Sequence, residues 1–186
     1  MSDARERLTR FDRTIVLRDG TPVHLRLIRA DDALRLIALY DRLSTDARYH
    51  RFFSVMRRLP VDWARFHAAV DYESRLALVV ESPADPDVLI AVARYEPADR
   101  PDTVEVAFVV EDGWQGRGLG RVLFTELLAA AALNGVRDFR AWVLADNRRM
   151  LALIAHLGQV HERAIDGGVV ELSFTARPAP SPESPG

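Results

Sequence analysis

The sequence predicts one domain of mixed α/β (α+β) structure. Near each end of the chain, two apolar or alternating runs flank a glycine-containing turn, which is typical of a β-hairpin. In the middle, three apolar runs joined by loops rich in proline and aspartate indicate an antiparallel meander. Between these groups of strands, apolar residues recur at helical spacing. With 186 residues, the chain is long enough to bury one hydrophobic core.

The predicted strands are short apolar or alternating runs bounded by turn residues. Arg18-Asp19-Gly20-Thr21 supplies the first hairpin turn and Asp166-Gly167-Gly168 supplies the last, because Asp-Gly and Gly-Gly pairs tolerate the positive φ angles of such turns. We expect strands at residues 14–17, 22–28, 76–81, 88–95, 103–110, 139–144, 160–165 and 169–175.

The predicted helices are segments with apolar residues at helical spacing and recognisable ends. They begin near residues 31, 48, 60, 121 and 146. The residues that we identify as starting or ending them are Asp31 or Asp32, Pro60, Asp146 or Asn147, Gly135 and Gly158. We expect a flexible N-terminus over residues 1–13, the folded domain over 14–176 and a disordered tail over 177–186.

Composition narrows the class of protein. Hydrophobic content of 48% and charged content of 28% are typical of a globular domain, and the net charge of −2 gives no bulk attraction to nucleic acid or membrane. No stretch approaches the length of a membrane span, so a cytoplasmic location is expected. Cysteine is absent, which excludes disulfides and thiolate sites. No metal is expected either, because four of the five histidines show no ligand spacing: His24, His50, His67 and His161.

A strand, a glycine-rich loop and a helix follow one another past the middle of the chain. The strand ends in a turn at Glu111-Asp112-Gly113, the loop is Gln115-Gly116-Arg117-Gly118-Leu119-Gly120, and the helical run starts at Val122. Loop amides and the unpaired amides of a helix start bind phosphate, and the helix dipole favours negative charge there. The sequence therefore predicts a phosphate-binding loop, with a glycine-rich turn that binds nothing as the alternative.

The spacing excludes two common phosphate loops. A P-loop needs Gly-Lys-Ser/Thr, but all 25 basic residues of this chain are arginine. A dinucleotide fingerprint needs G-x-G-x-x-G near the start of a parallel domain, whereas this chain has G-x-G-x-G preceded by glutamine. The loop is instead similar to the Q/R-x-x-G-x-G/A loop that binds the acyl-CoA pyrophosphate in the GNAT superfamily of N-acetyltransferases.

The chain resembles a GNAT over residues 14–175. The segments 17–21, 27–33 and 42–54 resemble in particular the GNAT domain of bacterial Pat-type protein lysine acetyltransferases. The resemblance implies a GNAT fold, which is a twisted, mixed and mostly antiparallel sheet with helices on both faces. It also implies acetyl-CoA as cosubstrate, without a metal.

Cofactor-binding residues follow from the same resemblance. Backbone amides hold the pyrophosphate, the loop entry is shaped by two residues, a strand pairs with the pantetheine arm, and an asparagine lies near the cofactor. The amides for the pyrophosphate match those of Arg117, Gly118, Leu119, Gly120 and Arg121, and the loop entry matches Gln115 and Gly116. The strand for the pantetheine arm matches Phe108, Val109 and Val110, and the asparagine matches Asn147. The side chains of Arg117 and Arg121 are further candidates for phosphate contacts, and a plain helix cap is the alternative role of Asn147.

Glu105 is the candidate general base. Strand alternation places Glu105, Ala107 and Val109 on one face of their strand. An amine near pKa 10.4 must lose a proton to attack, at a cost of about 4–5 kcal/mol at neutral pH. In Pat-type enzymes a glutamate on this strand accepts that proton, and Glu105 matches its position. The alternative is a structural ion pair, for example with Arg94.

One family feature is missing. Many GNATs protonate the leaving thiolate with a tyrosine on the helix after Asn147, but this helix has none. His156 is a candidate, although a surface role is the simpler interpretation. Because a thiol pKa is near 8.5, the thiolate is a tolerable leaving group without an acid. The general acid is therefore left unassigned.

The predicted function is acetyl transfer from acetyl-CoA to a primary amine. The resemblance favours a lysine of a protein as acceptor, with an acyl-CoA synthetase as the implied example. The alternatives are a small amine, such as an antibiotic or polyamine, and a non-catalytic acyl-CoA-binding regulatory module. The arginine- and aromatic-rich segment 48–58 is interpreted as an amphipathic helix or acceptor-site wall rather than an RNA-binding surface. No nucleic acid or membrane partner is expected, and the chain is expected to be a monomer or homodimer.

Overall fold

The computed structural model describes residues 6–52 and 58–177. Its strands form one sheet in the order β1-β2-β3-β4-β5-β6-β8-β7, in which every pair is antiparallel except β5 and β6. The strands are β1 (Arg13–Val16), β2 (Pro22–Leu27), β3 (Leu76–Glu81), β4 (Leu89–Pro97), β5 (Thr103–Val110), β6 (Asp138–Leu144), β7 (Gly158–Asp166) and β8 (Val169–Ala176). The predicted mixed, mostly antiparallel sheet is confirmed.

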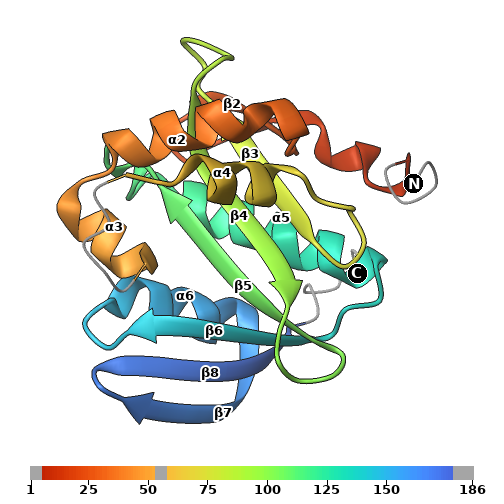
Figure 1. Ribbon diagram of the computed structural model, residues 1–186, viewed down its shortest axis with the longest axis vertical. Helices are drawn as coiled ribbons and strands as arrows, with labels where there is room; N and C mark the ends of the chain where they lie inside the picture. The colour runs from red at the N-terminus through yellow and green to blue at the C-terminus, as the bar shows by residue number, and fades with distance from the viewer. Residues whose placement is uncertain (1–5, 53–57, 178–186) are drawn as a thin grey trace, which may run out of the picture.

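Helices cover both faces of this sheet (Figure 1). The α-helices are α2 (Ala33–Arg42), α3 (Thr45–Phe52), α4 (Val61–Ala68), α5 (Leu119–Leu133) and α6 (Arg148–Leu157), and the 3-10 turns are η1 (Thr9–Phe11), η2 (Ala30–Asp32) and η3 (Asp112–Trp114). Residues of α5 and α6 share one buried cluster with one face of the sheet, and residues of α2, α3 and α4 share a second cluster with the other face. The site described below is lined by residues from both layers and by β5 between them.

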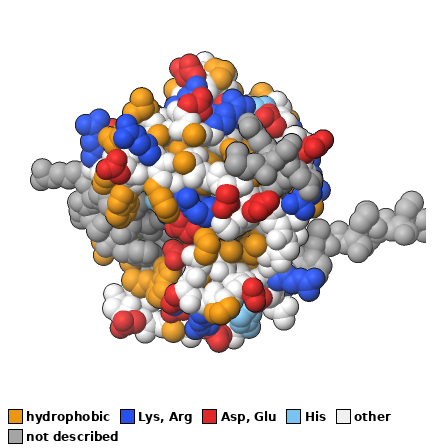
Figure 2. Space-filling model, turned by 45° about the vertical axis from the view of Figure 1, so that its right-hand side comes forward, with side chains coloured by type: hydrophobic (Ala, Val, Ile, Leu, Met, Phe, Trp, Pro, Cys, Tyr) orange, Lys and Arg blue, Asp and Glu red, His pale blue; other side chains and the backbone are white. Residues whose placement is uncertain are grey.

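Apolar spacing explains which side of each helix is buried. In α5, Leu123, Phe124 and Leu127 are fully buried against the sheet. In α4, by contrast, the small residues Ala64 and Ala68 face the core, while Trp63 and Phe66 are about half exposed. On the face shown in Figure 2, acidic and basic side chains are interspersed with hydrophobic ones. No helix in residues 6–52 and 58–177 is long and apolar enough to cross a bilayer.

Several element boundaries differ from the prediction. In the N-terminal segment, for which a flexible start was expected, the side chains of Leu8 and Phe11 are fully buried in the core beside β2. Helix α5 starts at Leu119, inside the glycine-rich motif. Strand β7 starts directly at Gly158, where an added Cβ would lie 2.6 Å from Phe174. The predicted tail from 178 onward and part of the segment 48–58 lie outside the described residues.

The sheet opens between β5 and β6. These two strands pair in parallel only over Thr103–Glu105 and Asp138–Arg140, whereas β5 stays paired with β4 as far as Val110. Beyond Glu105, the edge of β5 that faces β6 therefore has no strand partner within residues 6–52 and 58–177. Buried backbone N–H and C=O groups need partners, so this edge is a place where an extended ligand with amide groups can add to the sheet.

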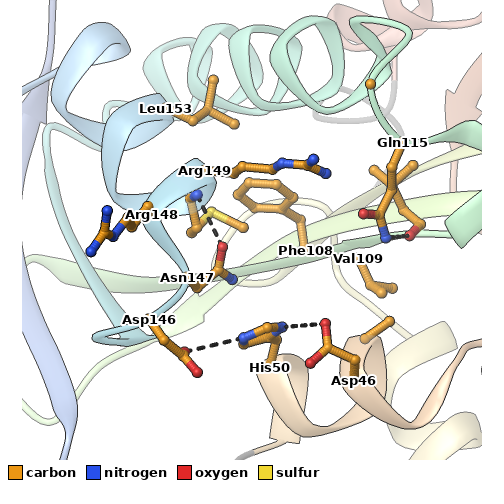
Figure 3. Close-up of a pocket in the computed structure, with 14 residues that line it drawn as sticks. Asp46, His50, Phe108, Val109, Gln115, Asp146, Asn147, Arg148, Arg149 and Leu153 are labelled. Carbon is orange, nitrogen blue, oxygen red and sulfur yellow. Dashed lines mark hydrogen bonds and ion pairs between the residues drawn. The ribbon is translucent and has the colours of Figure 1, made fainter.

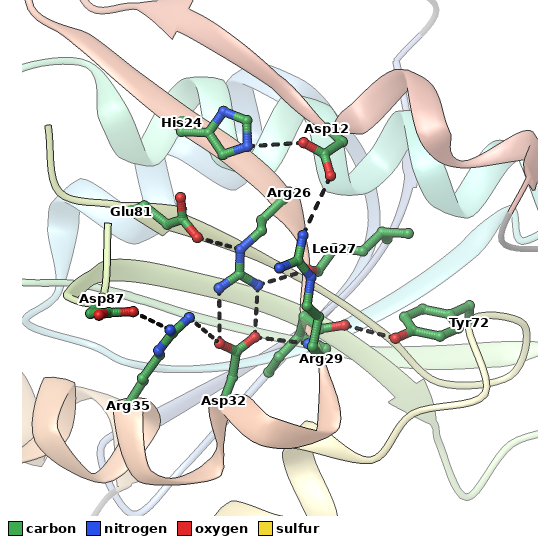
Figure 4. Close-up of polar contacts among 11 residues, drawn as sticks. Asp12, His24, Arg26, Leu27, Arg29, Asp32, Arg35, Tyr72, Glu81 and Asp87 are labelled. Carbon is green, nitrogen blue, oxygen red and sulfur yellow. Dashed lines mark hydrogen bonds and ion pairs between the residues drawn. The ribbon is translucent and has the colours of Figure 1, made fainter. Parts of the chain in front are cut away.

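A buried charge network joins the start of α2 to strands β2 and β3 (Figure 4). The Arg26 guanidinium donates to both carboxylate oxygens of Asp32, at 2.7 and 2.8 Å, and also to Glu81. The side chains of Arg26 and Asp32 are 1% and 0% exposed. Asp32 was predicted as a possible helix cap, and it stands at that position without a cap bond to a backbone N–H of α2. Its carboxylate accepts instead from Arg26, from the Arg29 N–H and from the Arg35 side chain of α2.

The protonation of Asp32 is linked to folding. Burial alone would raise the pKa of Asp32, but hydrogen bonds from Arg26 and from the Arg29 N–H outweigh burial and lower it below its usual value. The unfolded carboxyl titrates near pH 4, so the stabilisation is present above about pH 4 and is lost as the pH falls through the lower folded-state pKa.

We predict that Arg26→Met lowers the free energy of unfolding by about 3–5 kcal/mol, because it leaves Asp32 buried without its main counter-ion. Urea unfolding at neutral pH measures the loss. The matched control is Arg26→Met combined with Asp32→Leu, which removes both charges and should recover part of the lost stability. A single variant within about 1 kcal/mol of the unmodified protein would contradict this interpretation.

Candidate active site

The glycine-rich motif forms the start of α5. Gly118 is the N-cap residue with φ +89°, and Gly116 has φ +78°, both in the region that favours glycine. A backbone hydrogen bond joins Val122 N–H to the Gly118 carbonyl at 3.1 Å, so the amides of Leu119, Gly120 and Arg121 precede it. Such first-turn amides lack partners within a helix and, with the helix dipole, make an anion site.

The side chain of Arg117 is already engaged. Its guanidinium pairs with Asp19, donates to Thr21 Oγ1 at 2.7 Å and lies 4.3 Å over the Trp114 ring. The Thr21 N–H, followed by Arg117, lowers the pKa of Asp19 to about 2. In this structure the Arg117 side chain therefore connects the loop to the β1–β2 turn. The Arg121 side chain is exposed, beside Gly118.

A groove of about 580 Å³ runs from the loop to the start of α6 (Figure 3). Its walls come from β5, from the loop, from α3 and from the segment around the start of α6. Six of the predicted cofactor residues line it together: Phe108, Val109, Val110, Gln115, Gly116 and Asn147. The groove thus follows the open edge of β5 and reaches the phosphate-binding loop.

Two of these residues also hold the backbone of the walls. Gln115 Nε2 donates to the Val110 carbonyl at 3.0 Å and so fixes the end of β5. Asn147 is the N-cap of α6, where its Oδ1 accepts from the Met150 N–H at 3.1 Å. The cap role of Asn147 is thus present, and the same side chain lies on the groove.

Glu105 lies where β5 and β6 separate. It lines a small cavity of about 50 Å³ together with Phe108, Asn147 and His50. Phe108 and Asn147 also line the large groove, so the two cavities are adjacent. Among the described residues, Glu105 has no ion pair and no side-chain hydrogen bond. A carboxylate without a counter-ion at this position is free to exchange a proton with a ligand.

The alternative role of Glu105, an ion pair with Arg94, is not formed in this structure. Glu105 lies opposite Glu96 in the β4–β5 register, and Arg94 pairs with Glu96 at 3.3 Å. Burial lowers the pKa of Arg94, while the charges of Glu96 and Glu105 act in the opposite direction. Arg94 therefore provides a positive charge near Glu105 without occupying its carboxylate.

The structure adds two residues that sequence reasoning did not place at the site. His50 of α3 lies in the groove between Asp46 and Asp146, and Arg149 of α6 extends across Phe108 (Figure 3). The Asp46–His50 spacing of four residues is a helical-pair signal, but nothing local indicates Asp146 as the other partner. His156, the candidate acid, is exposed and lines neither cavity. Within the described part of the chain, no cluster of three or more His, Asp or Glu is suited to a metal ion.

The comparison with known families agrees with this geometry. Residues 33–159 match the acetyltransferase (GNAT) family. The chain belongs to this family.

The proteins to which this chain is similar include Pat acetyltransferases. The chain is 36% identical to the acetyltransferase Pat of Mycolicibacterium smegmatis over 94% of its own length, and it spans 53% of that protein. It is 30% identical to the acetyltransferase PA5475 of Pseudomonas aeruginosa, with 81% of each chain covered. The crystal structure of the GNAT domain of S. lividans PAT superposes with a TM-score of 0.80 at 33% identity, over 89% of this chain and 97% of that one.

We predict that Gly118→Ala and Gly120→Ala behave differently. The backbone of Gly118 has a positive φ that alanine rarely adopts, and a Cβ added there would lie 3.2 Å from the Arg18 side chain. A Cβ added at Gly120 would lie 3.8 Å from Val110 and 3.9 Å from Phe108, which are ordinary contact distances. Gly118→Ala should lower stability by about 1–3 kcal/mol and weaken CoA binding at least 10-fold. Gly120→Ala should keep both, as measured by thermal unfolding and calorimetry. Equal loss in both variants would contradict this account.

Proposed function

We propose that this acetyltransferase transfers the acetyl group of acetyl-CoA to a primary amine, with Glu105 as general base. The observation that supports this most directly is the unpaired Glu105 carboxylate at the opening between β5 and β6. It faces a cavity that adjoins the groove leading to the glycine-rich loop. A thioester whose pyrophosphate lies at the start of α5 and whose arm follows β5 would bring its carbonyl to this opening.

In the proposed reaction the amine attacks the thioester directly. The nitrogen lone pair forms the new C–N bond, the C–S bond breaks, and sulfur leaves with the electron pair. Glu105 accepts the amine proton, directly or through water. Backbone amides of β5 around Phe108–Val110 polarise the carbonyl as charge develops on its oxygen. The Arg94 guanidinium, paired with Glu96, leaves the Glu105 carboxylate available for this step.

The proposed acceptor is a lysine side chain of a protein, with an acyl-CoA synthetase as the example. Likeness to the Pat proteins supports this choice, and the similarity extends over nearly the whole chain. The phosphate groups of acetyl-CoA suit the amides at the start of α5, because the first N–H groups of a helix have no partner within the helix and can donate to phosphate oxygens. The cytoplasmic location expected from the sequence remains a prediction.

The test is thiol release from acetyl-CoA with an acyl-CoA synthetase as acceptor, beside a panel of small amines. Because the chain contains no lysine, an acetyl-lysine signal belongs to the acceptor when the protein carries no lysine-containing tag. Release with small amines only would reject the protein acceptor. Tight acetyl-CoA binding without release from any acceptor would reject catalysis and favour a binding module.

We predict that Glu105→Gln lowers kcat by about 10²-fold or more while leaving the Kd of acetyl-CoA within about threefold, because the amide cannot accept the proton. Steady-state kinetics and calorimetry measure the two quantities. The control is Glu126→Gln, which removes a carboxylate that pairs with Arg13 and lines neither of the two cavities. A kcat that falls equally in both variants would contradict a specific role of Glu105 as base.

A further inference from the structure

Helix α3 connects the two walls of the cofactor groove. At its start, Ser44 donates from Oγ to Asp112 Oδ1 at 2.6 Å and from its backbone N–H to Asp112 Oδ2 at 2.9 Å. The same Oγ accepts from the Ala47 N–H at 3.1 Å and so caps the helix. Because Asp112 belongs to the segment between β5 and α5, this end of α3 is attached to the wall that contains the phosphate-binding loop.

Further along α3, His50 makes the second connection. Its Nε2 lies 3.2 Å from Asp146 Oδ1, in the segment between β6 and α6, and its Nδ1 lies 3.3 Å from Asp46 Oδ2 on its own helix. Figure 3 shows the imidazole between the two carboxylates. His50 lines both the large groove and the small cavity that contains Glu105. Its position therefore bounds the place where the acyl end of the cofactor would lie.

The imidazolium form of His50 is the one that suits both contacts. Ionised carboxylates only accept hydrogen bonds, so both ring nitrogens can donate to them only in the imidazolium form. A neutral imidazole keeps one N–H, and one of the two carboxylates then loses its donor. The other charged groups around the groove are Arg148 and Arg149 of α6 and Glu105 of β5, which also bear on this charge.

The bridge has little to do with the stability of the fold. The carboxylates of Asp46 and Asp146 are 81% and 75% exposed, and exposed ion pairs contribute little to folding. The Asp146 contact joins residues 96 positions apart in the chain, on opposite sides of the groove. A contact that contributes little to folding but spans the groove can open and close at little cost to the stability of the fold, and it can therefore affect ligand binding in the groove.

We propose that His50 is a positioning residue for the cofactor: its imidazolium holds α3 against the segment before α6 and closes the groove along the thioester. This inference rests on the proposed function for the identity of the ligand. Closure requires the second proton on His50, so binding of the CoA arm and protonation of His50 favour each other. Cofactor affinity then falls as the pH rises and His50 loses this proton.

The test is calorimetric titration of the protein with CoA at several pH values from 5.5 to 8.5, for the unmodified chain and for His50→Gln. CoA has titrating groups of its own, so the informative quantity is the ratio of the two Kd values at each pH. We expect the unmodified chain to bind roughly 5–10-fold more tightly at pH 6 and about equally at pH 8.5. Near neutral pH it should also take up more protons on binding than the variant, as measured in buffers of different ionisation enthalpy.

Two further variants make the test independent of His50→Gln. His50→Arg keeps a permanent cation between the carboxylates and should retain tight binding at pH 8.5. Asp146→Ala removes the contact from the opposite wall and should reproduce the loss at pH 6. A Kd ratio that does not change with pH, together with equal proton uptake, would overturn the role of His50 while leaving acetyl transfer intact. Failure of all four proteins to bind CoA would instead reject the proposed cofactor, and this inference with it.

Discussion

The separation of β5 from β6 is the constraint on which the site depends. The two strands pair over three residues of each strand and then diverge, so one edge of β5 is left without backbone partners beyond Glu105. A polar backbone edge next to buried layers is stable only when water or a ligand satisfies it. The candidate site residues lie along this opening: Glu105 where the strands separate, Phe108–Val110 along the edge of β5, and Asn147 on the opposite side.

The segment between β2 and β3 contacts the rest of the protein through buried charges near η2 and through exposed charges around α3. Near η2, the Arg26–Asp32 pair is almost completely buried, and burial makes its removal costly. Around α3, the contacts from Ser44 and His50 are made to exposed carboxylates. The helical insert is therefore firmly held beside the core and weakly held beside the groove. The part of the insert that lines the groove is thus attached by weaker contacts than the part that packs on the core.

The parts of the structure that were predictable from sequence are those set by local chemistry. The Asp19-Gly20 turn, the glycine-rich start of α5 and the strand alternation around Glu105 each depend on residues close together in the chain. Contacts over long separations were not predictable, because no local pattern encodes the partner. Arg117 is held by Asp19, 98 residues away, and His50 meets Asp146. Likewise, Leu8 and Phe11 lie in a charged segment, and only the shape of the core shows that both are buried.

The contact between Arg117 and Asp19 joins the outer hairpin to the glycine-rich loop. Strand β1 is the outermost strand at one edge of the sheet, and the turn that follows it holds the phosphate-binding loop through this ion pair and through Thr21. The outer hairpin therefore meets the rest of the protein in two ways: Leu17 and Val23 are buried in the hydrophobic core, whereas Asp19 and Thr21 hold the Arg117 side chain by polar contacts. A substitution at Asp19 would thus change the surroundings of the glycine-rich loop while leaving the buried side chains of the hairpin in place.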